Sequence, residues 1–310
     1  MIQRYEFRLF AQYRDLLEDA PPRSPNPTQG IVVLRGIVGD AVFLKLAAIE
    51  SQLRKAGLGG TFGSWRIRRS YTQRELRSGE LFLLSIPITH LCAEDYGSIY
   101  TESETCRQEA FEMQSLDRRS GQFELVPRMV PCGLCSQQTT MLRVPFRKLS
   151  RSRDIIRLYG GELVISDRFS ILLTSGSYIG GDIRPAADAG KARSKANASK
   201  PAVTLHQLMF QSKPVEVSQD CRFGSDPFDR ESEGKYHCSS GEIAGNMLLT
   251  PLKIVRSSWN GEDVCRTRVY VGGRQGPYRP YQLLLVSSRL FHAMRQAGLK
   301  GFDYEVVELV

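Results

Sequence analysis

The 310-residue sequence lacks a long hydrophobic run. No apolar stretch reaches the roughly 18–20 residues that a membrane-spanning helix needs. The first residues also lack the apolar core of a secretion signal, because Arg4, Glu6 and Arg8 carry charge there. We therefore expect a cytoplasmic protein, and its 41% hydrophobic and 24% charged residues are typical of a globular chain.

Disulfides and common catalytic motifs are missing as well. The seven cysteines are an odd number without regular spacing, so we expect reduced thiols in the cytoplasm. The sequence has neither the Gly-x-Ser-x-Gly turn of hydrolases nor the Gly-Lys-Ser/Thr ending of a phosphate loop. Its four histidines do not have the spacing of a metalloprotease site. These absences predict a protein that is not an enzyme.

Acidic residues are too few to balance the basic ones. The 42 lysines and arginines outnumber the 33 aspartates and glutamates, and the net charge is +9. Such a surplus favours an acidic partner or nucleic acid. A first basic cluster predicts either a phosphate-binding surface or, as is typical of charge runs, a solvated face. Its members are Arg143, Arg147, Lys148, Arg151, Arg153 and Arg157, and those of a second cluster are Arg54, Lys55, Arg66, Arg68, Arg69, Arg74 and Arg77.

The sequence does contain a repeated unit. The C-terminal stretch LLLVSSRLFHAMRQAGLKGFDYEVVELV predicts a strand, a helix that is capped by Ser287 and ends at Gly298, and a second strand. The earlier stretch ELVISDRFSILLTSGSYIGGDIRP has the same pattern, with Ser166 in the place of Ser287 and Gly180 in the place of Gly301. A third, looser copy reads AAIESQLRKAGLGGTFGSWRI.

A second segment also recurs, and it contains the only Cys-x-x-Cys pair of the chain. The stretch CGLCSQQTTMLRVPFRKL aligns without gaps with CSSGEIAGNMLLTPLKIV. This alignment sets Cys132 against Cys238 and Leu142 against Leu248. The second copy has no counterpart of Cys135, so the repeated segment is degenerate.

These copies divide the chain into two related halves. The N-terminal half (1–185) contains the CxxC segment, and the C-terminal half (203–310) contains the degenerate copy and the second Ser-capped helix. Residues 186–202 lack an apolar period and predict a flexible linker or an exposed loop. The halves are either separate domains or two parts of one core. We predict an α+β fold with mixed or antiparallel sheets, short helices and recurring strand–helix–strand units.

Three kinds of chemistry fit the CxxC pair. A redox pair opens a helix behind a buried strand, but Pro131 precedes this pair and the following Ser-Gln-Gln-Thr-Thr disfavours a helix. A structural zinc needs four ligands. The candidates are Cys106, Cys132, Cys135 and Cys238, or His237 in place of Cys238. Because no second CxxC pair exists, the sequence favours a degenerate site without a cofactor, and one structural zinc is the alternative.

Four stretches together resemble double-CxxCG motif proteins and related immunity-type proteins of bacterial polymorphic toxin systems. They are RSGELFLLSIPITHLCAEDYGSIYTESETC, the CxxC segment, GELVISDRFSILL and the ending AGLKGFDYEVVEL. The chain departs from the family after Cys106, where the second cysteine is missing, and at Ser136, where the family has glycine. The resemblance implies a cytoplasmic, non-enzymatic protein that binds and neutralises a cognate toxin or shields its target.

The sequence thus leaves two functional hypotheses. The first is a binding protein of the toxin-immunity type, whose toxin presents an acidic face or contacts an acidic stretch such as Asp220–Glu233. The second is a nucleic-acid-associated protein that binds phosphates through the cluster Arg143–Arg157. Neither hypothesis requires a membrane.

Overall fold

The computed structural model divides the chain into two compact units. Unit 1 comprises Met1–Ser78 with Gly224–Ser232, and unit 2 comprises Gly79–Phe223 with Glu233–Val310. The structure describes residues 1–10, 31–56, 62–89, 100–101, 109–116, 123–130, 137–138, 141–158, 160–189, 204–224, 236–237, 243–244, 247–272 and 280–310. Within these ranges, no helix has the length and apolar character of a membrane span.

Unit 1 contains a three-stranded antiparallel sheet and a long helix. Its elements are β1 (Ile2–Phe10), β2 (Ile31–Ile37), α1 (Ala41–Lys55), β3 (Phe62–Ser70) and α2 (Gln73–Ser78). The central strand is β1, which pairs with β2 on one side and β3 on the other. Because side chains alternate along a strand, Tyr5, Phe7 and Leu9 share one face, where they are buried with Leu46 of α1. The side chains of the even-numbered residues of β1 lie on the opposite face.

Helix α1 begins directly after Asp40, as an N-capped helix should. The Asp40 carboxylate accepts a hydrogen bond from the backbone N–H of Phe43 at 2.8 Å and from that of Ile37 at 3.0 Å. Burial, together with the neighbouring Asp40 carboxylate, raises the pKa of Tyr5 to about 12. The buried face of unit 1 is therefore fixed by apolar packing and by this cap.

Two sheets in unit 2 have the same plan. The first contains β10 (Ile155–Arg157), β11 (Leu163–Ser166), α3 (Asp167–Ser175), β12 (Gly181–Pro185) and β14 (Leu205–Phe210). The second contains β4 (Leu81–Ser85), β20 (Val264–Val271), β21 (Tyr281–Ser287), α4 (Ser288–Gln296) and β22 (Asp303–Leu309). The order of the first sheet, β10-β11-β14-β12, corresponds one to one to β20-β21-β4-β22, four neighbouring strands of the seven-stranded second sheet. In both sheets, the helix connects the second strand of this order to the fourth. Helix α3 connects β11 to β12, and α4 connects β21 to β22.

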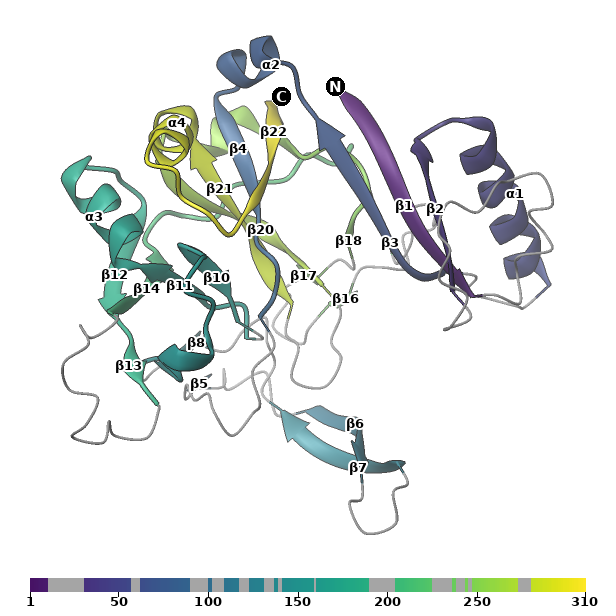
Figure 1. Ribbon diagram of the computed structural model, residues 1–310, viewed down its shortest axis with the longest axis horizontal. Coiled ribbons are helices and arrows are strands. Elements are labelled where there is room, and N and C mark those ends of the chain that lie inside the picture. The colour runs from purple at the N-terminus through teal and green to yellow at the C-terminus, as the bar shows by residue number, and fades with distance from the viewer. Residues whose placement is uncertain are drawn as a thin grey trace. The chain divides into compact units, whose positions relative to one another are not determined.

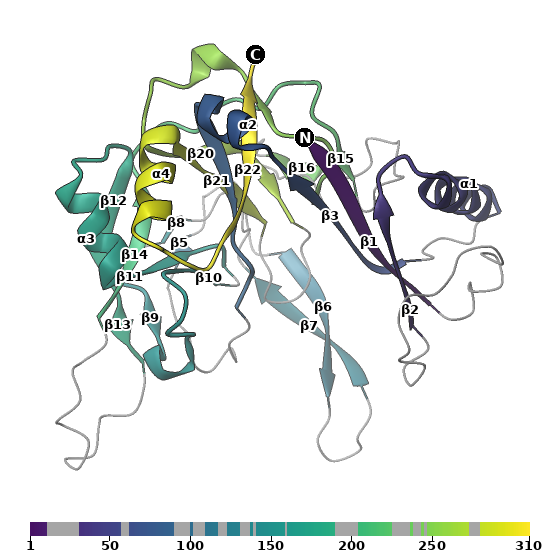
Figure 2. The same ribbon diagram turned by 45° about the horizontal axis from the view of Figure 1, so that its top comes forward.

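The third strand of each order comes from the other copy. We call residues 81–188 repeat A and residues 205–310 repeat B. Strand β4 opens repeat A but pairs antiparallel with β21 and β22 of repeat B. Strand β14 opens repeat B but pairs antiparallel with β11 and β12 of repeat A. Figures 1 and 2 show the blue strand β4 between the yellow strands β21 and β22. The two repeats have therefore exchanged their first strands.

The exchange preserves the pairing register. Ser287, at the end of β21, lies opposite Leu81, the first residue of β4. Ser166, at the end of β11, lies opposite Leu205, the first residue of β14. Leu81 and Leu205 are both buried. The exchanged strands thus occupy equivalent positions in the two sheets.

Unit 1 has the same topology without an exchange. Its strand order, β2-β1-β3, again places a first strand between the strand before the helix and the strand after it. Here the central strand β1 is the element directly before β2 in the chain, so all three strands of the sheet come from the same copy. The looser third copy in the sequence corresponds to the α1–β3 part of this unit.

The remaining elements extend or connect these sheets. They are β5 (Tyr100–Thr101), β6 (Glu109–Leu116), β7 (Phe123–Val130), β8 (Gln137–Gln138), β9 (Arg143–Val144), η4 (Phe146–Lys148), β13 (Ala187–Asp188), β15 (Phe223–Gly224), β16 (Tyr236–His237), β17 (Ile243–Ala244), β18 (Met247–Leu248), β19 (Lys253–Ile254) and η7 (Arg256–Ser258). Strands β6 and β7 form an antiparallel hairpin, and β5 pairs with β8. Strand β9 runs parallel to β13, and β19 runs parallel to β22.

These two parallel pairs correct the register of the repeated segment. Each is followed by a short 3-10 helix, η4 after β9 and η7 after β19. Leu142 therefore corresponds to Leu252, and not to Leu248 as the gap-free alignment predicts. Both leucines are fully buried, as are Val144 and Ile254 two positions further on. The gap-free alignment is wrong here because it matches identical letters, whereas the structure preserves the burial pattern.

The α+β fold with related halves and recurring strand–helix–strand units is confirmed. The pairings cross the predicted division of the chain, since β4 of the half 1–185 lies in a sheet with strands of the half 203–310. Of the predicted linker 186–202, Ala187–Asp188 form β13, and the part from residue 190 onward lies outside the described residues. Within unit 2, each of the two sheets contains strands of both halves.

Candidate functional site

The four predicted zinc ligands lie outside the described residues. They are Cys106, Cys132, Cys135 and Cys238. The alternative ligand His237 belongs to β16, of which the structure describes the backbone only. In the part of the chain that the structure describes, no group of three or more His, Cys, Asp or Glu residues is arranged to hold a metal ion. The zinc site stays a prediction, which elemental analysis of protein purified without added zinc tests.

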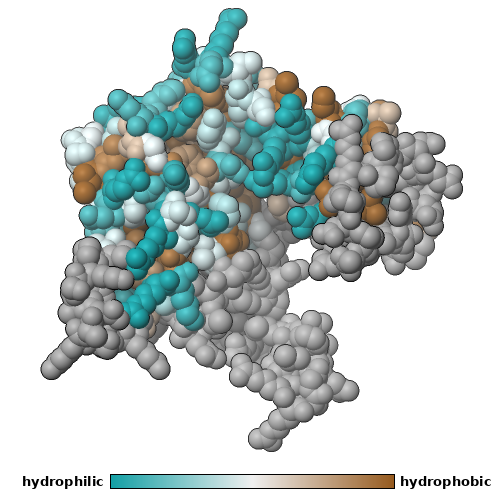
Figure 3. Space-filling view, viewed as in Figure 1, coloured by the Kyte–Doolittle hydropathy of each residue, from teal (hydrophilic) through white to brown (hydrophobic). Residues whose placement is uncertain are grey.

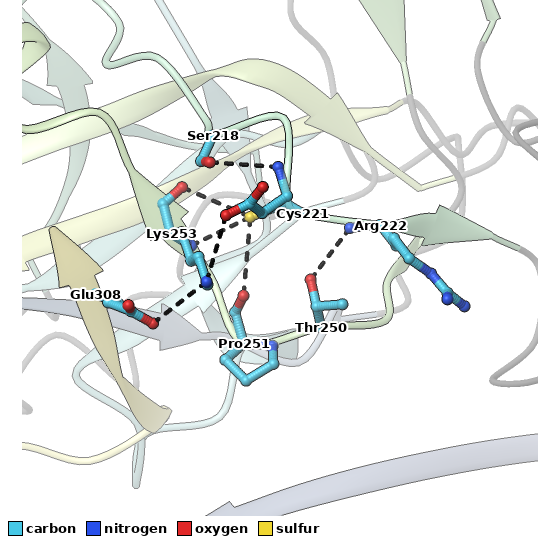
Figure 4. A network of polar contacts seen from close by, with 8 residues as sticks. Ser218, Cys221, Arg222, Thr250, Pro251, Lys253 and Glu308 are labelled. Atoms are coloured by element: carbon cyan, nitrogen blue, oxygen red, sulfur yellow. Dashed lines mark hydrogen bonds and ion pairs between the residues drawn. The ribbon is translucent and has the colours of Figure 1, made fainter. Parts of the chain in front are cut away.

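The two described thiols are buried in the core of unit 2. Figure 4 shows the Cys221 thiol directed at the backbone of Pro251 and Lys253. Its sulfur lies 3.8 Å from the Pro251 oxygen and accepts a hydrogen bond from the Lys253 N–H at 3.2 Å. Burial raises the pKa of Cys221, and burial raises that of Cys265 to about 12. Neither thiol is a ready nucleophile, because the reactive form is the thiolate.

The first basic cluster is only partly accessible. Its exposed members are Arg143, Arg147, Lys148 and Arg151. Arg157 is only 2% exposed, and its guanidinium carbon lies 4.1 Å from the centre of the Tyr281 ring. Burial lowers the pKa of Arg157 to about 10, against an opposing effect of Tyr281. Arg157 therefore packs inside unit 2 and cannot contact a phosphate at the surface.

A buried aspartate of repeat A binds repeat B. The Asp154 carboxylate accepts a hydrogen bond from the Ser166 hydroxyl at 2.8 Å and from the Lys300 backbone N–H at 2.9 Å. Arg168 forms an ion pair with Asp154 at 3.5 Å and donates to the Ala297 carbonyl oxygen at 2.7 Å. Lys300 and Ala297 belong to the turn after α4, so Asp154 and Arg168 connect the repeats.

The equivalent aspartate of repeat B makes the reciprocal contacts. Asp263 accepts a hydrogen bond from the Ser287 hydroxyl at 2.6 Å and from the Ile179 backbone N–H at 3.0 Å. Arg289 pairs with Asp263 and donates to the Ser177 carbonyl oxygen at 3.4 Å. Burial alone would raise the pKa of Asp263, but the hydrogen bonds from Arg289 and Ser287 hold it below its usual range.

These Asp–Ser–Arg networks combine helix capping with contacts between the two repeats. Each serine hydroxyl also accepts a hydrogen bond from the helix it caps, Ser166 from Phe169 and Ser287 from Leu290. Neither described network includes a histidine that could take a proton from the serine, as a hydrolase needs. The networks therefore hold the two repeats together.

The exposed face of the unit 1 sheet is rich in arginine. Arg4 of β1 lies directly opposite Arg68 of β3. Glu6 of β1 lies opposite Arg66 of β3 and Arg35 of β2. Directly opposed residues share a face of the sheet, and Arg8 belongs to this face as well because it lies two positions from Glu6. We call these residues the arginine face; they are Arg4, Arg8, Arg35, Arg66 and Arg68, with Glu6. Figure 3 shows hydrophilic side chains gathered over β1 and β3.

One carboxylate lies among the five guanidinium groups of the arginine face. Glu6 Oε2 accepts a hydrogen bond from Arg35 Nε at 2.7 Å, and Glu6 Oε1 lies 3.9 Å from Arg8 Nη2. The hydrogen bond from Arg35 lowers the pKa of Glu6 against the opposing effect of burial, and the charges of Arg35, Arg8 and Arg68 lower it further. All five arginines are exposed. The face therefore carries a strong positive field.

The clustering of basic residues in the sequence indicates this face only in part. The second basic cluster includes Arg66 and Arg68 but omits the arginines of β1 and β2. The missing signal is the alternation in IQRYEFRLF, where Arg4, Glu6 and Arg8 alternate with three buried apolar residues. Such a pattern is typical of a strand with one buried and one exposed face.

No protein-family model matches the chain, and no curated protein matches it. A function therefore has to be inferred from the residues and the fold.

Proposed function

We propose that the protein is a non-enzymatic binding protein of the toxin-immunity type, which neutralises a cognate bacterial toxin in the cytoplasm by stoichiometric binding. The observation that carries this proposal is the position of the segments that resemble immunity-type proteins. LFLLS is β4, GELVIS leads into α3, and the C-terminal ending forms the turn after α4 and β22. All three contribute to the two exchanged sheets of unit 2.

The chemistry of the described groups agrees with a binding role. Cys221 and Cys265 are buried thiols with raised pKa values. The Asp154 and Asp263 networks are engaged in structural hydrogen bonds. The basic surface favours an acidic partner, because charge complementarity speeds encounter and excludes wrong partners.

The test begins with the gene next to this one. If that gene encodes a secreted toxin, we expect the purified toxin and this chain to form a 1:1 complex with a dissociation constant of about a nanomolar. Toxin activity should fall linearly with added chain and vanish at equimolar ratio. Residual activity at excess chain, or loss of activity at far lower ratios, would contradict stoichiometric neutralisation.

The second candidate is a nucleic-acid-associated protein that uses the first basic cluster. It is supported by the exposure of Arg143, Arg147 and Arg151 around β9 and η4. Binding of generic duplex DNA should then weaken steeply with added salt, because released counterions dominate such contacts. Arg147→Glu should reduce both the affinity and the slope of its dependence on salt. A salt-tolerant complex with a single protein would argue against this candidate.

A further inference from the structure

The arginine face opposes like charges directly across two strands. Arg4 of β1 and Arg68 of β3 are register partners, and like charges in that position destabilise a sheet. An acidic residue at either position would instead have formed a cross-strand ion pair, as Glu6 does with Arg35. The chain thus keeps a local arrangement that costs stability. Arrangements of this kind are expected where a surface serves binding.

The composition of this face distinguishes between two classes of partner. All five of its cations are arginines, and protein interfaces are enriched in arginine and depleted in lysine. Two exposed aliphatic residues share the face, Ile2 at 50% and Ile37 at 56% exposure. Binding of single-stranded nucleic acid relies on exposed aromatic rings that stack on bases. None of the described side chains of this face is aromatic.

The guanidinium groups match carboxylates in geometry as well as in charge. An arginine can bind a carboxylate through two parallel hydrogen bonds. Side chains on one face of a strand recur every second residue, and neighbouring strands lie about 4.8 Å apart. Arg4, Arg8, Arg35 and Arg68 therefore form a regular array on the sheet, and the exposed Ile2 and Ile37 supply apolar contact beside it.

We propose that the arginine face of unit 1 is a docking surface for an acidic protein segment that presents Asp or Glu side chains together with apolar ones. This inference rests on the proposed function only for the identity of that protein. The surface lies on the solvent side of the β2-β1-β3 sheet, opposite the face that α1 covers. It does not involve the first basic cluster or the cysteines.

The experiment uses the full chain and two labelled probes, a peptide in which Glu and Asp alternate with Leu, and a short duplex DNA. The decisive variant is Arg68→Glu, because it replaces the like-charge pair with Arg4 by an attractive pair. Its melting temperature should change little, because the attraction gained to Arg4 offsets the attraction to Glu6 that is lost, while its affinity for the peptide should fall by about tenfold or more. Arg147→Glu makes the same change of charge on η4 of unit 2 and should leave peptide affinity nearly unchanged.

Three outcomes would overturn the docking surface. The first is no binding of the peptide. The second is an equal loss of peptide affinity in Arg68→Glu and Arg147→Glu, which would reflect net charge alone. The third is tighter binding of the DNA, lost in Arg68→Glu, which would make the face a nucleic-acid site. If a toxin is identified and the Arg68→Glu variant still neutralises it fully, the proposed docking surface is refuted while the proposed function stands. If the chain neutralises no toxin but its binding of the peptide depends on Arg68, the docking surface stands while the proposed function is refuted.

Discussion

Single residues connect the repeats of unit 2, and Asp263 is the clearest case. It is 3% exposed and accepts hydrogen bonds from Ser287, Arg289 and Ile179. Asp263→Asn removes the charge that these donors share, so we expect the free energy of unfolding at neutral pH to fall by roughly 2 kcal/mol. Urea unfolding measures this loss. Asp182→Asn is the control, because Asp182 makes an ion pair with Arg184 at the surface.

The same aspartate predicts a dependence on pH. The pKa of Asp263 is below its usual range in the folded protein, so the unfolded chain takes up the proton at a higher pH than the folded one. Its contribution is fully present above about pH 4, the ordinary value for Asp, and is lost as the pH falls through the folded pKa. Asp263→Asn should therefore flatten the loss of stability in acid. If the free energy of unfolding of the variant fell in acid as steeply as that of the original protein, the loss would belong to other carboxylates.

Gly301 allows the turn after α4 to approach repeat A. Its φ angle is 111°, and an added Cβ would lie 2.5 Å from the Ile155 carbonyl oxygen. We expect Gly301→Ala to cost roughly 2 kcal/mol or more, from backbone strain and this contact. Gly298→Ser is the matched control. Gly298 has a φ of 65° with nothing near its Cβ position, and its counterpart Ser177 already carries a side chain at 50°. Equal losses in thermal unfolding would contradict this explanation.

At the scale of elements, the helix caps are the most local devices. Ser166 and Ser287 accept from the third residue of their helices and donate to a buried aspartate. Replacement of either by Ala should cost about 1 kcal/mol. Each substitution also removes a donor from a buried aspartate, and the loss should be larger for Ser287, because its bond to Asp263 is buried whereas that of Ser166 to Asp154 is only partly buried. Ser175→Ala, at the exposed end of α3, makes the same chemical change and should not destabilise, since Ala favours helix. Equal effects of the three substitutions in urea unfolding would exclude capping as the cause.

The caps and turns were predictable from sequence because their signals are local. A cap involves residues three positions apart, and both Ser166 and Ser287 lie where the pattern predicts them. The strand exchange carries no such signal, because Leu81 pairs with residues more than two hundred positions away, and any apolar strand would satisfy the same pattern. The arginine face lies between these extremes. Its alternation is visible in β1, but only the register with β2 and β3 places Arg35 and Arg68 beside it.

At the scale of the whole molecule, unit 2 resembles an exchanged dimer whose two copies are joined in one chain. Each repeat supplies the other with a central strand, and each buried aspartate accepts a backbone hydrogen bond from the opposite repeat. Unit 1 is the same topology with its own first strand in place. Because the first strand of each repeat lies in the sheet of the other repeat, neither repeat can complete its sheet alone. Repeats A and B should therefore fold and unfold together, and unit 1 should behave independently.

Phe82→Ala tests this cooperativity. Phe82 of β4 is fully buried and stacks on Phe291 of α4, with ring centres 3.8 Å apart. Its loss should cost about 3–5 kcal/mol. Because β4 comes from repeat A and lies in the sheet of repeat B, amide hydrogen exchange should accelerate equally in β11 and β21 while α1 keeps its protection. Leu46→Ala, in the core of unit 1, should accelerate exchange in α1 and leave β11 and β21 protected. If β11 stayed protected while β21 exchanged, the repeats would be separate folding units, and the exchanged strands would not couple them.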